Sequence, residues 1–216
     1  MKRKIFLLSA IILSLSLFLS ACGQKDIGEA KAKEIGLEYI NKIFGVNETE
    51  ATVYRYMEEC LPENDGAVVT GDPNIGTRVV YIVRVAKSES MWQYEAGVVA
   101  SSGVPYFAQQ NEVNIIMTDE QKEKANTLFA NERNWGEKHE AALAELKEAS
   151  IQFVRDKFSP KSAILVSAST GEYQSSTMTT TFKDSFYVVL RDGTIYLVRM
   201  HWPSMQVLGF SVEHSS

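Results

Sequence analysis

The chain has 216 residues and a formal net charge of −5, with 45% apolar and 23% charged residues. This composition is typical of a globular protein and excludes a disordered chain. An acidic chain is repelled by nucleic acid and by anionic lipid headgroups, so we expect neither as a partner.

The N-terminal segment predicts a lipoprotein signal peptide at residues 1–21. Basic residues at positions 2–4 precede an apolar run at 5–19, which is short for a membrane span and long enough for the apolar core of a signal peptide. An ordinary secretory peptide that happens to contain a cysteine is the alternative. The run ends in a sequence that resembles the bacterial lipobox, Leu19, Ser20, Ala21 and Cys22.

The lipobox resemblance implies cleavage before Cys22, transfer of a diacylglyceryl group to its thiol and acylation of its new amino group. More than one acyl chain anchors a protein stably, so we expect attachment to the extracytoplasmic face of the cell membrane through this lipid. Loss of the three basic residues changes the formal charge from −5 to −8. The remaining thiol, Cys60, is either buried or half-buried at a strand end, or exposed and able to pair with another protein.

Residues 27–117 predict one helix followed by strands, after a short tether at 22–26. Asp26 and Glu29 form a start similar to a capping box, and apolar residues then recur at helical spacing until Gly45, which is placed to end the helix. Pro105 favours an edge position for the last strand. The predicted strands are 51–58, 77–86 and 91–100, with one further extended segment at 104–117.

Residues 118–135 predict a helical linker, and 136–216 a second helix followed by strands. Thr118 and Gln121 begin the linker helix, and Ser159-Pro160 ends the next helix after Phe158. Asp192-Gly193 is a hairpin turn of the type that requires a positive φ. The strands are expected at 162–169, 175–182, 185–192, 194–202 and 206–213. This order of elements indicates an α+β fold with antiparallel sheets.

The two long helices resemble each other. Residues 32–47 and 146–161 align at an offset of 114 positions and keep the same apolar face. Downstream, residues 81–83 match 187–189, and Tyr94 matches Tyr196. We interpret the repeat as a duplication, since the order of helix, strand and hairpin is also shared. Convergence of two amphipathic helices is the alternative.

The repeated pattern is similar to PepSY-type domains. The residues that carry the resemblance are EAKAKEIGLEYINKIFG at 29–45 and FYVVLRDGTIYLVRMHWPSMQVLGFSVE at 186–213. The resemblance implies two tandem modules, 27–117 and 136–216, each a helix packed on an antiparallel sheet. Such modules occur in propeptides of thermolysin-like peptidases, in spore-germination proteins and in envelope lipoproteins. The chain departs from the family in the last hairpin of each half, at 99–103 and 201–205.

No catalytic motif stands out. The sequence lacks GxSxG, P-loop, CxxC and GxGxxG patterns. His139 begins a pattern similar to a zinc-peptidase helix, but Leu143 occupies the position of the second ligand. His201 and His214 make a weak metal site, with Glu213 as the only nearby carboxylate. We therefore expect no metal, no cofactor and no enzymatic activity.

Two sets of side chains are candidates for partner binding. Hydroxyls at 177, 179 and 181 alternate along a predicted strand, and form either the solvated face of an edge strand or a flat polar binding face. Four aromatic residues lie on the predicted hairpins, where they either pack the sheet against its helix or face outward as anchors for a protein or peptide. These are Trp92, Tyr94, Tyr196 and Trp202.

The resulting functional hypothesis is a membrane-anchored lipoprotein that binds a protein or peptide in the cell envelope, and the family resemblance adds restraint of a secreted peptidase. An unprotected sheet edge is one means of capturing an extended peptide. The alternative is a lipid-anchored sensor or solute-binding accessory of a membrane complex. An open sheet face or edge favours the first reading, and an enclosed pocket the second.

Overall fold

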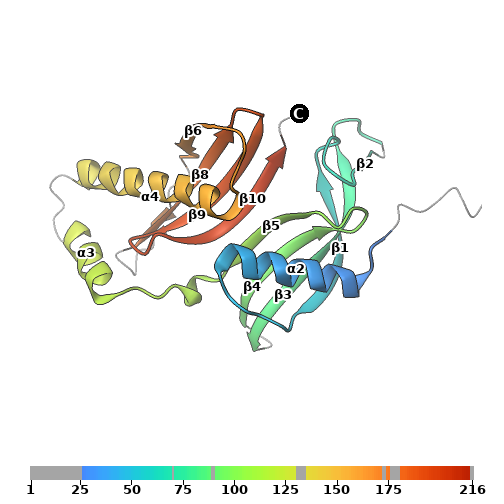
Figure 1. Ribbon diagram of the computed structural model, residues 1–216, viewed down its shortest axis with the longest axis horizontal. Coiled ribbons are helices and arrows are strands. Elements are labelled where there is room, and N and C mark those ends of the chain that lie inside the picture. The colour runs from blue at the N-terminus through green and yellow to red at the C-terminus, as the bar shows by residue number, and fades with distance from the viewer. Residues whose placement is uncertain are drawn as a thin grey trace, which may run out of the picture.

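A computed structural model describes residues 26–69, 71–88, 91–129, 135–171, 174–175 and 181–214. Across these residues the chain is a mixed α+β protein with an antiparallel sheet (Figure 1). The predicted signal peptide, Cys22, Thr177 and Thr179 lie outside the described residues. No helix in the described ranges is long and apolar enough to cross a membrane.

The elements follow one another as helix, strands, helix, helix and strands. The first group is α2 (Glu29–Phe44), β1 (Thr52–Cys60), β2 (Val68–Val69), β3 (Gly76–Ser88), β4 (Met91–Val99) and β5 (Pro105–Gln110). A 3-10 turn, η1 (Glu112–Asn114), and α3 (Asp119–Phe129) come next. The last group is α4 (Trp135–Phe158), β6 (Ile164–Ser169), β7 (Gln174–Ser175), β8 (Phe182–Leu190), β9 (Thr194–Trp202) and β10 (Gln206–His214).

The strands form one continuous sheet in the order β1-β3-β4-β5-β10-β9-β8-β6, with β2 beside β3 and β7 beside β8. The strand pairs are antiparallel. Helix α2 packs on β3, β4 and β5, whereas α4 packs on β6, β8 and β9 (Figure 1). One hydrophobic core contains residues of both helices and of both groups of strands, so the helices cover the same side of the sheet. We call the other side the open face.

The long helices are built as the sequence predicts. The buried positions of α2 follow the helical repeat, and Gly45 ends the helix with φ 69°, a conformation that glycine adopts without strain. Gly36 allows close packing on the sheet, because a Cβ there would lie within 2.9 Å of three side-chain atoms of Val83. Helix α4 ends at Phe158, and Lys157 is half-buried where its counterpart Ile43 is buried.

The predicted capping box at the start of α2 is wrong. The N-cap of α2 is Gly28, which makes no side-chain cap bond. Asp26 instead accepts hydrogen bonds from the Gly28 N–H at 2.8 Å and the Tyr81 hydroxyl at 2.7 Å. The start of α3 is confirmed, because the Thr118 N–H donates to Gln121 Oε1 and the Gln121 N–H donates to Thr118 Oγ1.

Two strand predictions also need correction. The extended segment at 104–117 is strand only to Gln110, and η1 follows it. Pro105 does not mark a sheet edge, since β5 lies between β4 and β10. It is the first residue of its strand, and β10 pairs only with residues 107–109, so its missing N–H lies outside that ladder. The last two hairpin strands and the turn at Gly193, with φ 90°, are confirmed.

The junction of β5 with β10 is symmetric. Phe107 faces Ser211, and Gln109 faces Gly209. Adding 102 to the residue number turns 107 into 209 and 109 into 211. The pair Phe107–Ser211 therefore corresponds to the pair Gly209–Gln109, and the pairing is the same when the two halves are exchanged. The same shift relates Tyr94 of β4 to Tyr196 of β9, as the sequence predicts.

The symmetry extends to the helices and corrects one part of the predicted alignment. Tyr94 packs on Phe44 with ring centroids 5.3 Å apart, and Tyr196 packs on Phe158 at 5.1 Å. However, Val85 faces Tyr94 and Val188 faces Tyr196. Val85 therefore corresponds to Val188, and the offset between β3 and β8 is 103 positions. The predicted match of 81–83 with 187–189 requires an offset of 106. That match paired Tyr81, which is buried beneath α2, with Tyr187, which is 42% exposed.

Candidate functional site: the β1 edge and the open face

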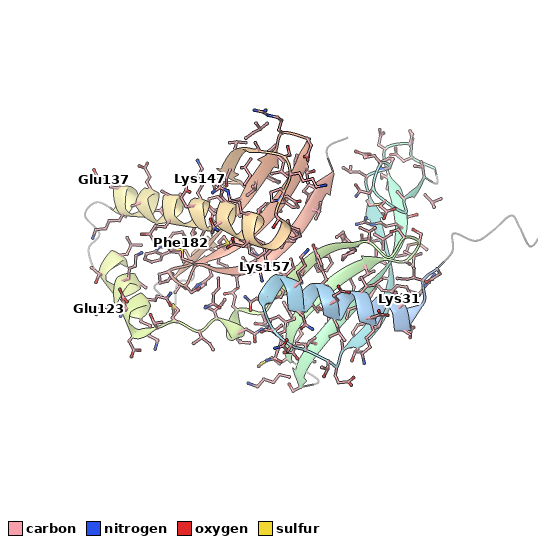
Figure 2. The ribbon with its side chains drawn as sticks, viewed as in Figure 1. Lys31, Glu123, Glu137, Lys147, Lys157 and Phe182 are labelled. Carbon is pink, nitrogen blue, oxygen red and sulfur yellow. The ribbon has the colours of Figure 1, made fainter. Side chains whose placement is uncertain are left out.

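Two of the four predicted aromatic anchors are buried. Trp202 is 1% exposed and stacks on Phe182, which lies beneath α4 (Figure 2). Tyr94 is also buried and packs on the end of α2. Both therefore pack the sheet against its helix in this structure. Trp92 and Tyr196 are half-buried, and Tyr196 stacks on Phe158 and Phe210.

The histidines lie apart from one another. His139 on α4 packs against the Phe182 ring at 5.0 Å, and burial lowers its pKa. His201 is buried on the open face, where Nδ1 lies 2.8 Å from Ser204 Oγ. Its pKa is lowered by burial, which the nearby Glu112 carboxylate partly opposes. Within the described ranges, no group of three or more histidine, cysteine or acidic side chains is arranged to hold a metal ion.

The side chains of Thr181 and Cys60 are packed against the protein and do not stand free on its surface. Thr181 is buried just before β8, so this hydroxyl does not belong to a solvated strand face. Cys60 is half-buried at the last position of β1, opposite Gly76. Burial raises the pKa of its thiol, which favours the unreactive protonated form. This placement agrees with the strand-end interpretation of Cys60.

The free edge of β1 is long and mostly exposed. Over its nine residues β1 pairs only with β3 among the described residues. Its exposed side chains include Tyr56 and Met57, which are 50% and 73% exposed, and Tyr54, over which the Arg84 guanidinium lies at 5.1 Å from the ring centroid. Most of β1 is thus open to solvent along one backbone edge.

The opposite edge is shorter. It is formed by β6, which has six residues and pairs with β8. Leu165 is 58% exposed there. The two edges therefore differ in length and in aromatic content, and only β1 carries tyrosine side chains at its surface.

A line of polar side chains crosses the open face from β3 to β9. Arg84 Nε donates to Glu95 Oε1, and Gln109 Nε2 donates to Glu95 Oε2 at 2.8 Å. Arg199 Nη2 lies 3.4 Å from Gln109 Oε1. The strand register places Gly209 of β10 between Gln109 and Arg199. We call Arg84, Glu95, Gln109 and Arg199 the polar row.

These surfaces supply binding groups. The β1 edge offers backbone N–H and C=O groups to an extended chain. The polar row offers the guanidinium groups of Arg84 and Arg199 and the amide of Gln109, whereas Glu95 is buried.

Comparisons with known proteins give one structural similarity. No protein-family model matches the chain, and no curated protein sequence matches it. Its fold is similar to the Bacillus megaterium YpeB C-terminal domain, with 12% sequence identity and a TM-score of 0.39. The similarity covers 87% of this chain and 63% of the YpeB chain.

Proposed function

We propose that this protein is a lipid-anchored, non-enzymatic binding protein of the cell envelope that captures an extended segment of a partner protein along the free edge of β1. The observation that carries the proposal is the nine-residue edge strand with exposed Tyr54, Tyr56 and Met57. A long exposed edge strand that carries apolar side chains favours pairing with another chain unless it is protected.

Strand addition follows from the chemistry of this edge. Nine residues extend over about 30 Å, and in an antiparallel pair alternate residues direct both backbone groups outward. An extended partner segment would therefore gain roughly eight to ten main-chain hydrogen bonds along β1. Tyr56 and Met57 point to opposite faces of the sheet, so they would contact alternate side chains of the partner and give the interaction its sequence preference.

We further propose that the chain is a tandem pair of PepSY-like modules produced by duplication. The symmetric β5–β10 register and the equivalent contacts of Phe44 with Tyr94 and of Phe158 with Tyr196 support this. The family resemblance then makes a secreted peptidase a reasonable partner, which the module would restrain by holding one of its extended segments.

The proposed anchor places the edge near the membrane. Arg55 of β1 donates to Asp26 at 3.4 Å, and Cys22 precedes Asp26 by four positions. Four residues span at most about 14 Å. A lipid on Cys22 would thus hold the β1 edge close to the bilayer surface, where a membrane-associated or newly secreted partner passes.

Site-specific photo-crosslinking in the producing cells tests this function. The photo-reactive amino acid p-benzoylphenylalanine replaces Met57 in one full-length protein and Leu165 in a matched control. We expect discrete protein adducts from position 57 and none of these from position 165. Met57→Lys, which replaces the most exposed apolar side chain of β1 with a charge, should abolish capture of the same partner, whereas Leu165→Lys should not.

Two results would contradict the proposal. Identical adducts from positions 57 and 165 would mean that the crosslinks report crowding at the membrane surface. Undiminished capture by Met57→Lys would mean that the partner binds elsewhere. Because both positions are highly exposed, neither substitution is expected to disturb the fold.

A further inference from the structure

Arg199 has an unusual environment for an arginine in the middle of a sheet. It lies on the open face of β9, between Ser185 of β8 and Gly209 of β10. A Cβ at Gly209 would lie 3.2 to 3.5 Å from Nη2, Nε and Cζ of Arg199. The guanidinium therefore lies directly over the backbone of β10, where a larger residue would crowd it.

The guanidinium has few partners for a group that always carries a charge and five N–H donors. Its Nε is buried and makes no hydrogen bond within the described part of the chain, where the guanidinium makes only the long hydrogen bond from Nη2 to Gln109. Among the described residues, no carboxylate forms an ion pair with Arg199. A buried donor left unpaired destabilises a fold, so a partner is expected from outside.

A hollow lies in front of this group. It has a volume of about 260 Å³, and Arg199 is the only charged residue that lines it. Ser185, Ser211 and Gln109 add hydroxyl and amide groups, and Phe107 and Leu197 add apolar walls. The volume is below the roughly 300–1,000 Å³ of sites for drug-sized ligands, so it suits one small group or one amino-acid side chain.

The symmetry of the sheet shows that packing alone does not require a charge at this position. Positions that differ by 102 are equivalent in the two halves, so Gly97 corresponds to Arg199 and Phe107 corresponds to Gly209. In the first half the Phe107 ring covers Gly97. In the second half the guanidinium of Arg199 covers Gly209. An apolar ring fills the equivalent space, so the charge at Arg199 is an addition to the packing.

From these observations we propose that the hollow at Arg199 is a binding site for a single carboxylate carried on a peptide. A planar guanidinium binds a carboxylate through two parallel hydrogen bonds, and one isolated positive charge matches a monoanion. Ser185 provides a further hydroxyl, whereas the Ser211 hydroxyl donates to Glu213 Oε1 at 3.1 Å, and the apolar walls accommodate the body of the residue. Arg199 lies on β9, five strands from β1 along the sheet, so the site goes beyond the proposed edge binding and does not depend on it.

Titration of the full-length acylated protein in detergent micelles tests the site, with the Arg Nε–H resonances as the readout. The probes are N-acetyl-L-leucine, its neutral amide, N-acetyl-L-glutamic acid α-amide and inorganic phosphate. We expect the two carboxylate probes to shift the Arg199 resonance with roughly millimolar affinity, as is usual for ligands of this size. If N-acetyl-L-leucine binds more tightly, the carboxylate that the site recognises is that of a chain terminus. If N-acetyl-L-glutamic acid α-amide binds more tightly, it is that of an acidic side chain.

Matched variants separate binding from folding. Arg199→Met should weaken carboxylate binding roughly tenfold or more, the effect of losing a charge-assisted hydrogen bond, and should leave the unfolding midpoint unchanged or higher. Arg199→Lys keeps the charge but lacks the planar donor pair, so it should also bind more weakly. Arg191→Met, at an exposed arginine in the β8–β9 turn, is the control and should bind normally.

The proposal is overturned by any of three results. In the first, the protein binds N-acetyl-L-leucine and its neutral amide equally well. In the second, it binds phosphate but neither carboxylate probe. In the third, the Arg199→Lys and Arg199→Met variants bind the carboxylate probes as tightly as the unaltered protein does. The test is independent of the β1 edge, because Met57→Lys should titrate like the unaltered protein even where it has lost its protein partner.

Discussion

Phe210 lies at the centre of the molecule, on β10 opposite Ala108 of β5, and its removal should weaken both halves of the protein together. Its side chain is 3% exposed. The ring lies 4.7 Å from that of Phe158 and 5.6 Å from those of Phe153 and Tyr196. The Tyr39 ring of α2 approaches it at 6.4 Å. Phe210 thus joins α2, α4 and the sheet.

We expect Phe210→Ala to lower the free energy of unfolding by about 4 kcal/mol. Core phenylalanine truncations cost roughly 3–5 kcal/mol, and we place the site no lower than the middle of that range because aromatic pairs add about 0.5–1.5 kcal/mol each beyond buried area. In a protein of this size, each kcal/mol shifts the unfolding temperature by roughly 2–4 °C. The midpoint should therefore fall by about 10 °C or more.

Urea and thermal unfolding, followed by circular dichroism and tryptophan fluorescence, measure this effect. Tyr187→Ala is the control, because that side chain is 42% exposed, and it should change stability by less than about 1 kcal/mol. A loss below about 1.5 kcal/mol for Phe210→Ala would refute the reasoning. So would two separate transitions of which only one moves, because that would mean that the halves do not share one core.

Three further predictions follow from individual side chains. Gly36→Ala should destabilise the protein by about 1–3 kcal/mol in urea titrations, since the clash with Val83 outweighs the gain in helix propensity of roughly 1 kcal/mol; a more stable variant would contradict this packing. Burial holds the pKa of His201 below its ordinary value of 6.5, so the unfolded state binds the proton first and stability falls as the pH drops from about 7 towards 5. His201→Gln should flatten that slope, and an unchanged slope would assign it to other groups. Cys22→Ala should move the protein from the membrane fraction to the soluble fraction, and retention in the membrane would reject the lipid anchor.

Local features of the structure could be predicted because local chemistry decides them. The buried stripe of α2 follows from the helical period, and the turn at Gly193 follows from its positive φ. The capping box at Thr118 and Gln121 needs only a spacing of three residues. The false capping box at Asp26 shows the limit of such patterns, because Tyr81 and Arg55, which are distant in the sequence, bind that carboxylate.

Features that depend on strand register could not be predicted. A shift of one residue reverses the face of every side chain in a strand, and the error of three positions in the β3–β8 alignment did so for Tyr187. The pairing of β5 with β10, and therefore the approach of Arg199 to Gly209 and Gln109, joins segments about 90–100 positions apart. No local pattern specifies that contact, so the sequence contained no signal for the hollow at Arg199.

Hydrogen exchange of the backbone tests the central claim most directly. The full-length protein is compared alone and in complex with the purified partner identified through position 57, and amide protection is measured by mass spectrometry. Strand addition predicts new protection at residues 52–60 and unchanged exchange at 164–169, since backbone hydrogen bonds form only along β1. A bound partner that leaves residues 52–60 exchanging at the rate of the free protein would contradict the account.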